Sequence, residues 1–258
     1  KIPGTQLKHY QYRHIVSEFG NMITSIRFVG GDLNKPNVFI VHRDFEMDHT
    51  KIIQQVGYRL KSEYSIFNPL RIRWFSPKKE NVLIKRNSFI EGDLMYVSEF
   101  LENIRIKPNS NPEYNISLKP CDNINWYSNY VAEYQKLFDL DDDFIEMAQP
   151  ESETTLQGLL NKQLLFEIHI NNQWAGVIAA DFHKEFFLDG FVIYEELLIE
   201  KYRGRGLAKE IQLRFIEQLP HSENKQLFGT IHYQNIPSIR TAYAVGRQFC
   251  GMYLWANI

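Results

Sequence analysis

The chain has 258 residues, of which 44% are hydrophobic and 23% are charged, and its formal net charge is -2. This composition excludes an intrinsically disordered protein, and the length allows one large domain or two smaller ones. Cys121 and Cys250 are far apart and have no Cys or His at metal-ligand spacing, so we expect no disulfide framework and no metal. No segment approaches the roughly 18 apolar residues of a membrane span, and we expect a cytoplasmic protein.

The charge is distributed unevenly along the chain. Residues 1–112 contain 17 Lys and Arg against 11 Asp and Glu, whereas residues 113–258 contain 12 against 20. Docking of a basic half against an acidic half explains this pattern, so we do not expect a nucleic-acid partner. The sequence is compatible with a monomer and with a homodimer.

A connector divides the chain near its middle. Residues 106–115 contain two prolines and three asparagines, which interrupt any periodic pattern. The sequence therefore predicts an N-terminal α/β domain over residues 1–110 and a second domain over residues 115–258. In the first domain, apolar and β-branched content predicts strands at 26–29, 37–42, 57–67, 70–75 and 81–84, and helical spacing predicts helices at 47–56 and 93–104.

The second domain has a more regular order of predicted elements. Asn171-Asn172 separates two strand patterns and tolerates the positive φ of a hairpin turn, Ser152 is placed to cap a helix, and Pro220 to end one. Strands are predicted at 116–118, 164–170, 174–181, 186–200, 226–232 and 249–258, and helices at 124–138, 152–162, 207–219 and 236–245. The order is β-α-α-β-β-β-α-β-α-β.

The segment 203–209 (RGRGLAK) follows a predicted strand and opens a predicted helix. Glycines let the backbone approach an anion closely, and the first turn of a helix adds free amides and a positive dipole end. Arg203, Arg205 and Lys209 add positive charge. The segment is either a phosphate-binding loop or only a tight turn before a helix.

The pattern Arg203-x-x-Gly206-x-Ala208 resembles the signature of the GNAT superfamily of acetyltransferases, and the element order over 115–258 is similar to its fold. The resemblance implies a mixed-sheet α/β fold and acetyl-CoA as co-substrate. It also implies that strand-end backbone groups hold the pantetheine arm and that loop amides hold the pyrophosphate. The implied cofactor-binding residues are Leu198, Ile199, Arg203, Gly204, Arg205, Gly206, Leu207, Ala208, Lys209, Asn235 and Ser238.

A second segment, from Asn235 to Gly246, is similar to the Asn-led helix late in the GNAT fold. Asn235 and Gly246 are also residues that cap the two ends of a helix. Aligning them places Ala242 where many family members have the tyrosine that protonates the thiolate. Tyr243 lies about 100° further round the helix, and it is a candidate acid or a packing residue.

Two adjacent glutamates, Glu195 and Glu196, are the candidates for the base that deprotonates an ammonium substrate. Strand alternation sends them to opposite faces. The resemblance favours Glu196 as the base, and a β-bulge would reverse the choice. The acidic run 139–146, continued by Glu151 and Glu153, is either an acceptor site for a cationic amine or a solvated loop.

Residues 47–56 followed by Gly57-Tyr58 are similar to the late helix and glycine-aromatic pair of the GNAT fold, so the first domain is either a degenerate partial copy or a domain in which a helix simply ends at a glycine before a strand. The resemblance implies an N-acetyltransferase that transfers the acetyl group directly to a primary amine of a small molecule. The alternatives are an acyl-CoA-binding or regulatory protein without turnover, and an acetyltransferase for a macromolecule held by the basic half.

Overall fold

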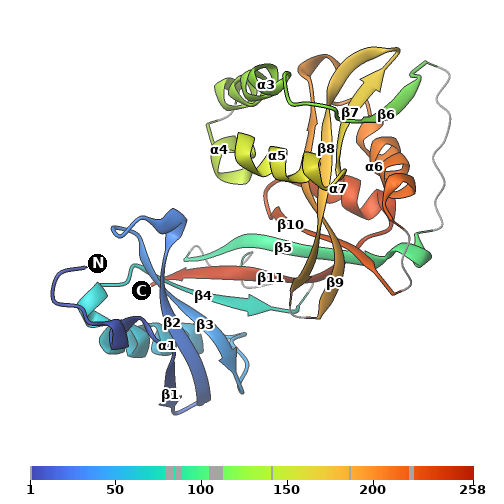
Figure 1. The fold of residues 1–258 in the computed structure, drawn as a ribbon. Helices are drawn as coiled ribbons and strands as arrows, with labels where there is room; N and C mark the ends of the chain where they lie inside the picture. Colours follow the sequence, from blue (N-terminus) through green and yellow to red (C-terminus); the bar gives the residue numbers. More distant parts are fainter. Residues whose placement is uncertain are drawn as a thin grey trace. The chain divides into compact units, whose positions relative to one another are not determined.

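The computed structural model describes residues 2–78, 84, 89–104, 113–140, 142–185, 187–220 and 224–258 (Figure 1). The chain forms two compact units, one of Lys1–Met95 with Cys250–Ile258 and one of Tyr96–Phe249. Most of the predicted connector, nearly all of the predicted strand 81–84, and Asp141 of the acidic run lie outside the described residues. The domain limits at 110 and 115 therefore stay a prediction.

In the first unit, an antiparallel meander is followed by a helix and a parallel strand. β1 pairs with β2 and β2 with β3 in antiparallel fashion, β4 runs parallel to β3, and β11 pairs antiparallel with β4. The elements are β1 (Arg13–Ser17), β2 (Gly20–Phe28), β3 (Pro36–Arg43), α1 (Thr50–Glu63), β4 (Arg71–Ser76) and β11 (Gln248–Asn257), while β5 (Ile90–Phe100) crosses the division between the units. β11 was predicted within the second domain, but its residues 252–257 pair with a strand of the first unit.

Two predicted elements of this region are wrong. The predicted strand 57–67 is mostly helix, because α1 continues to Glu63 with Ile53, Val56, Gly57 and Leu60 on its buried face. The predicted helix 93–104 is mainly β5, in which residues 95–98 are all buried. A strand covered on both faces has a continuous buried run instead of an alternating pattern, and such a run cannot be told from a helix by periodicity alone.

The second unit is a mixed sheet with helices on both faces. Its strands lie in the order β10-β9-β8-β7-β6, with β9 and β10 parallel and the other pairs antiparallel. The elements are β6 (Ile116–Pro120), α3 (Tyr127–Leu140), α4 (Phe144–Met147), α5 (Glu153–Asn161), β7 (Leu165–Ile170), β8 (Gln173–Glu185), β9 (Leu188–Leu198), α6 (Leu207–Gln218), β10 (Gln226–His232) and α7 (Ile236–Val245). The predicted mixed α/β fold is confirmed.

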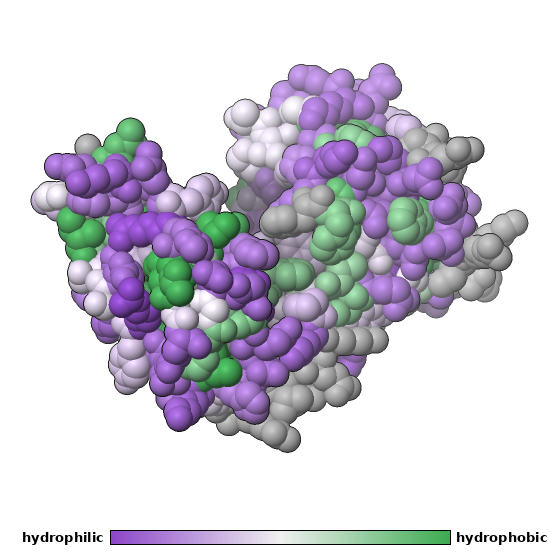
Figure 2. Space-filling model, turned by 90° about the horizontal axis from the view of Figure 1, so that it is seen from below, coloured by the Kyte–Doolittle hydropathy of each residue, from purple (hydrophilic) through white to green (hydrophobic). Residues whose placement is uncertain are grey.

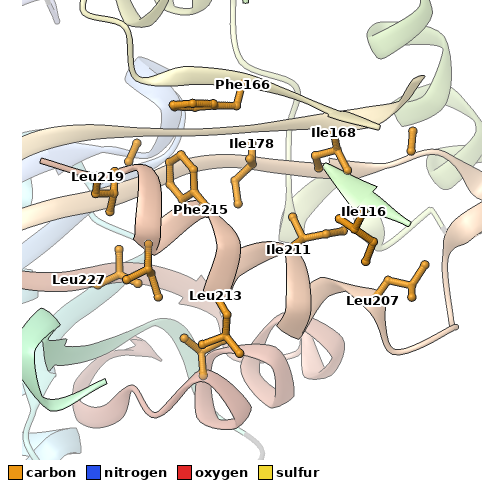
Figure 3. Packing of buried hydrophobic residues seen from close by; sticks show 14 of the residues in the cluster. Ile116, Phe166, Ile168, Ile178, Leu207, Ile211, Leu213, Phe215, Leu219 and Leu227 are labelled. Carbon is orange, nitrogen blue, oxygen red and sulfur yellow. The ribbon is translucent and has the colours of Figure 1, made fainter. Parts of the chain in front are cut away.

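Alternation along β8 shows which helices cover which face. Ile178 packs with Ile211 and Phe215 of α6 (Figure 3), whereas the neighbouring Val177 packs with residues of α3 and α5. The β7–β8 hairpin turns at Asn171 and Asn172, which adopt φ of 51° and 64°. Both asparagines therefore have the positive φ that the sequence predicts.

The first unit repeats the topology of part of the second. The meander β1–β2–β3, helix α1 and parallel strand β4 correspond to the meander β7–β8–β9, helix α6 and parallel strand β10. A partial copy is therefore present, but its helix α1 occupies the place of α6. The predicted match of residues 47–58 to the later helix, equivalent to α7, is wrong.

The surface is mainly hydrophilic on the face seen in Figure 2, where hydrophobic residues form separate patches. Within the described part of the chain, the helices are too short or too polar to cross a membrane.

Candidate functional site

The parallel strands β9 and β10 are paired over only part of their length. Their register covers three residue pairs, from Gly190 with Gln226 to Val192 with Phe228. β9 then continues to Leu198 and β10 to His232, and no further pair between these two strands is found among the described residues. The two strands therefore diverge toward their carboxyl ends.

A β-bulge lies on β9 just after the divergence begins. Ala179 of β8 pairs with Glu195 and Ala180 with Ile193, so Tyr194 is an extra residue on β9. In the sequence argument, a bulge at this place makes Glu195 instead of Glu196 the candidate base.

Beyond β9, the chain forms the loop that the sequence singled out. Gly204 and Gly206 have φ of 71° and 73°, a left-handed conformation that glycine adopts without strain. Gly206 is the N-cap of the 12-residue helix α6, and no side chain caps it. The first-turn amides of Leu207, Ala208 and Lys209 have no acceptor within the helix, so this end can bind an anion.

The side chain of Arg203 points into the protein. Its Nε donates to the Leu198 carbonyl at 2.6 Å, and Nη2 donates to the Glu133 carboxylate at 3.0 Å. Burial lowers the pKa of Arg203. The exposed Arg205 donates Nη1 to the Tyr114 hydroxyl at 2.9 Å. The Arg203 side chain therefore links the end of β9 to α3.

A pocket of about 310 Å³, which we call the divergence pocket, lies where β9 and β10 separate. Its two strand walls are residues 192–194 and 228–230. Glu185 accepts a hydrogen bond from the Tyr96 hydroxyl at 3.0 Å, and Tyr194 Oη lies 3.3 Å from His183 Nε2. Burial raises the pKa of Glu151. The lining residues are Tyr96, Glu151, His183, Glu185, Val192, Ile193, Tyr194, Phe228, Gly229 and Thr230.

Glu195 is buried among residues of α3. Its carboxylate accepts hydrogen bonds from the hydroxyls of Tyr130 and, at 2.9 Å, Tyr134. Burial raises the pKa of Glu195 to about 7, although the two hydroxyls oppose the shift. The carboxyl group is not part of the divergence pocket lining.

Glu196 faces the opposite side of the sheet. Gln212 of α6 donates to its Oε2, while Oε1 is buried without a hydrogen-bond partner. Gln212 also accepts from the buried Arg247 at 2.8 Å. Burial raises the pKa of Glu196 to about 7 and lowers that of Arg247 to about 10. Glu196 does not line the divergence pocket either.

The remaining predicted residues lie on α7. Asn235 caps the helix by accepting from the Ser238 amide at 3.2 Å, and Gly246 ends it with φ of 108°. Ala242 is fully buried, whereas Tyr243 is 40% exposed and is not part of the divergence pocket lining. Tyr243, Glu195 and Glu196, the three predicted catalytic residues, therefore all lie outside the divergence pocket lining.

Among the described residues of the acidic run 139–146 and its continuation, one, Glu151, lines the divergence pocket. Asp142 and Asp143 are exposed around the start of α4, whereas Glu151 lies in the pocket lining with Glu185. Sequence reasoning missed Glu185 and Tyr96. Glu185 lies on β8 beyond the predicted end of that strand at 181, and Tyr96 lies in a segment predicted as a helix, so no local signal identified either residue.

No protein-family model and no curated protein matches the chain. Among solved structures, it is similar to a GNAT-family acetyltransferase from Colwellia psychrerythraea, with a TM-score of 0.53 and 8% identity over 93% of this chain and 85% of that one. It is also similar to a GCN5-related N-acetyltransferase from Sphaerobacter thermophilus, with a TM-score of 0.54 and 8% identity over 99% of this chain and 82% of that one. The chain therefore has the GNAT acetyltransferase fold that the glycine loop predicts.

Proposed function

We propose that the protein is an N-acetyltransferase that moves the acetyl group of acetyl-CoA directly to a primary amine of a small molecule. The observation that carries the proposal is the divergence of β9 from β10 immediately before an uncapped helix N-terminus. Such an arrangement offers amides for a pyrophosphate and a gap between two strands for an extended thioester.

The cofactor would lie along the end of β9 and the loop that follows. The amides of Gly204, Gly206, Leu207 and Ala208 would hold the pyrophosphate, and Lys209 would add positive charge. Backbone groups at Leu198 and Ile199 would bind the pantetheine arm, with Asn235 and Ser238 on the α7 side. The Leu198 carbonyl already accepts from Arg203 and the Ile199 amide donates to Ala175, so further contacts would use the remaining backbone groups.

The acceptor would occupy the divergence pocket. Glu151 and Glu185 place two carboxyl groups in its lining, which favours an amine that arrives as a cation. The aromatic rings of Tyr96 and Tyr194 would contact the carbon atoms of such a substrate. A small polyamine or aminosugar has this combination of charge and size.

Binding of the cofactor can be tested with one pair of glycines. Gly206 and Gly30 both have positive φ and open space around the Cβ position, but Gly30 lies in a turn of the first unit. Millimolar acetyl-CoA should raise the melting temperature of the wild type and of Gly30→Asp but not that of Gly206→Asp. Equal shifts in all three proteins would contradict the site.

A second candidate function is an acyl-CoA-binding protein without turnover. Ala242 favours it, because the fully buried methyl group cannot protonate a leaving thiolate. The two functions differ in the release of free thiol when acetyl-CoA is mixed with a panel of amines. Binding without thiol release would support the second candidate.

A further inference from the structure

The backbone of Glu151 is held from both sides by tyrosines of α3. Its amide donates to the Tyr130 hydroxyl at 2.6 Å, and its carbonyl accepts from the Tyr127 hydroxyl at 3.3 Å. Glu151 precedes α5 in a segment without secondary structure, so no helix or strand hydrogen bonds restrain its backbone. The two bonds to the tyrosine hydroxyls provide this restraint instead. The two bonds thereby hold the backbone from which the Glu151 side chain reaches the lining of the divergence pocket.

The Tyr130 hydroxyl connects Glu151 to a buried carboxyl group, that of Glu195. It donates its proton to Oε2 of Glu195 while its oxygen accepts from the Glu151 amide. Tyr134 holds the other carboxylate oxygen, so Glu195 has a fixed orientation. An ionised carboxylate accepts from both hydroxyls at once, and this directs the lone pair of Tyr130 toward Glu151.

We propose that Glu151 accepts the proton of the bound ammonium group and that Tyr130 and Glu195 are positioning residues that hold Glu151 for this step. The inference rests on the proposed function. One nitrogen proton passes to the Glu151 carboxylate and then to solvent, and the neutral amine attacks the thioester carbonyl carbon. The C–N bond forms and the C–S bond breaks. A second nitrogen proton ends on the thiol sulfur, giving an amide and free coenzyme A.

The route agrees with three features of the site. Glu195 and Glu196 both lie outside the pocket lining, so neither is placed to touch the amine, whereas Glu151 is. Burial raises the pKa of Glu151, which makes its carboxylate a better proton acceptor near neutral pH. Because the thiolate takes its proton from the amine nitrogen, the step needs no acid on α7 at the position of Ala242.

Two tyrosines provide a matched pair of variants. Tyr130→Phe and Tyr134→Phe each remove one hydroxyl that bonds Glu195, but only Tyr130 also reaches Glu151. Tyr130→Phe should lower kcat/KM for the amine by about 10-fold or more, leave KM for acetyl-CoA within about two-fold, and speed hydrogen exchange of the Glu151 amide. Tyr134→Phe should cause a smaller loss and no faster exchange at Glu151. Equal effects of the two variants would overturn the positioning role.

The proton transfer itself is tested by Glu151→Gln. The rate of the wild type should fall as the pH falls through the pKa of Glu151, and the variant should lose about 100-fold in kcat together with this acidic limb. Glu195 also titrates, with a pKa of about 7, so the kcat value decides: a kcat of Glu151→Gln within about two-fold of the wild type would overturn the role of Glu151 as base. The titratable groups around Glu151 are Tyr127 and Tyr130 of α3, His183 and Glu185 of β8, Tyr194 and Glu195 of β9, and Tyr96 of β5.

Failure of the proposed function gives a different result. If the wild type binds acetyl-CoA but releases no thiol with any amine, the proton transfer is overturned together with the enzymatic function. Faster exchange of the Glu151 amide in Tyr130→Phe alone would then still establish the positioning contact, because this measurement does not depend on turnover.

Discussion

Glu196 and Arg247 are joined through a single buried amide, that of Gln212, which donates to the glutamate and accepts from the arginine. No direct ion pair between the two charges is found among the described residues. The amide oxygen and nitrogen therefore satisfy one atom of each charged group, while Glu196 Oε1 and Arg247 Nε stay without a partner.

Replacing Gln212 by leucine should destabilise the protein strongly. The substitution leaves both charged groups buried without this partner, and we expect a loss of about 3 kcal/mol in the free energy of unfolding. Gln157 on α5 is an exposed amide that bonds Asn161, so Gln157→Leu is the control and should cost under about 0.5 kcal/mol. Urea denaturation measures both. Similar losses in the two variants would contradict the role of the buried amide.

The raised pKa values of Glu195 and Glu196, both about 7, make stability depend on pH. A carboxyl group with a higher pKa in the folded than in the unfolded state binds more protons when folded, so its contribution favours folding at low pH. Between about pH 4.5 and 7 these two groups should therefore lower the free energy of unfolding as the pH rises.

Glu196→Gln should flatten this part of the stability profile, because glutamine does not titrate. Glu217 is exposed on α6, and Glu217→Gln removes one charge without removing a buried titration. Denaturation at a series of pH values compares the two variants. A slope in Glu196→Gln as steep as in Glu217→Gln would contradict the assignment.

The chain should bind one acetyl-CoA. The first unit has the same order of meander, helix and parallel strand, but the segment before α1 carries Asp44, Glu46 and Asp48 where the second unit has glycines and arginines. Carboxylates at this place repel a pyrophosphate. Isothermal titration should give a stoichiometry near one, and a value near two would show that both copies bind.

Arg203 should matter for stability as well as for binding. Arg203→Met removes its bonds to the Leu198 carbonyl and to Glu133, and we expect a loss of about 2 kcal/mol together with weaker acetyl-CoA binding. Arg214 pairs with Glu210 one turn away on the same helix, and Arg214→Met should cost under about 0.5 kcal/mol with unchanged binding. Thermal unfolding with and without acetyl-CoA separates the two effects. Unchanged binding by Arg203→Met would limit the arginine to a structural role.

The parts of the fold predicted correctly depend on local signals. α6 has an amphipathic face and a glycine before it, and the β7–β8 hairpin has Asn171-Asn172 at its turn. β5 was mistaken for a helix because burial on both faces removed its alternation. The place of β11 in the first unit depends on pairing with residues far away in the sequence, which no local pattern contains.

The two parts of the candidate site also differ in whether they depend on local sequence or on contacts between distant residues. The loop of Gly204 and Gly206 is contiguous, so its conformation follows from its own residues and their order. The divergence pocket is assembled from β5, β8, β9, β10 and the segment before α5. Its acidic character depends on which distant residues meet, and the described carboxylates of the acidic run 139–146, which the sequence singled out, do not line the pocket.

The pairing of β11 with β4 has a consequence for how the protein is made. The ribosome completes every residue of the second unit before it adds residues 252–257. During synthesis, one edge of β4 therefore stays unpaired while the second unit can already fold. An exposed strand edge can pair with other chains, so the interval before the last strand emerges is the period when the nascent protein is most open to misassociation.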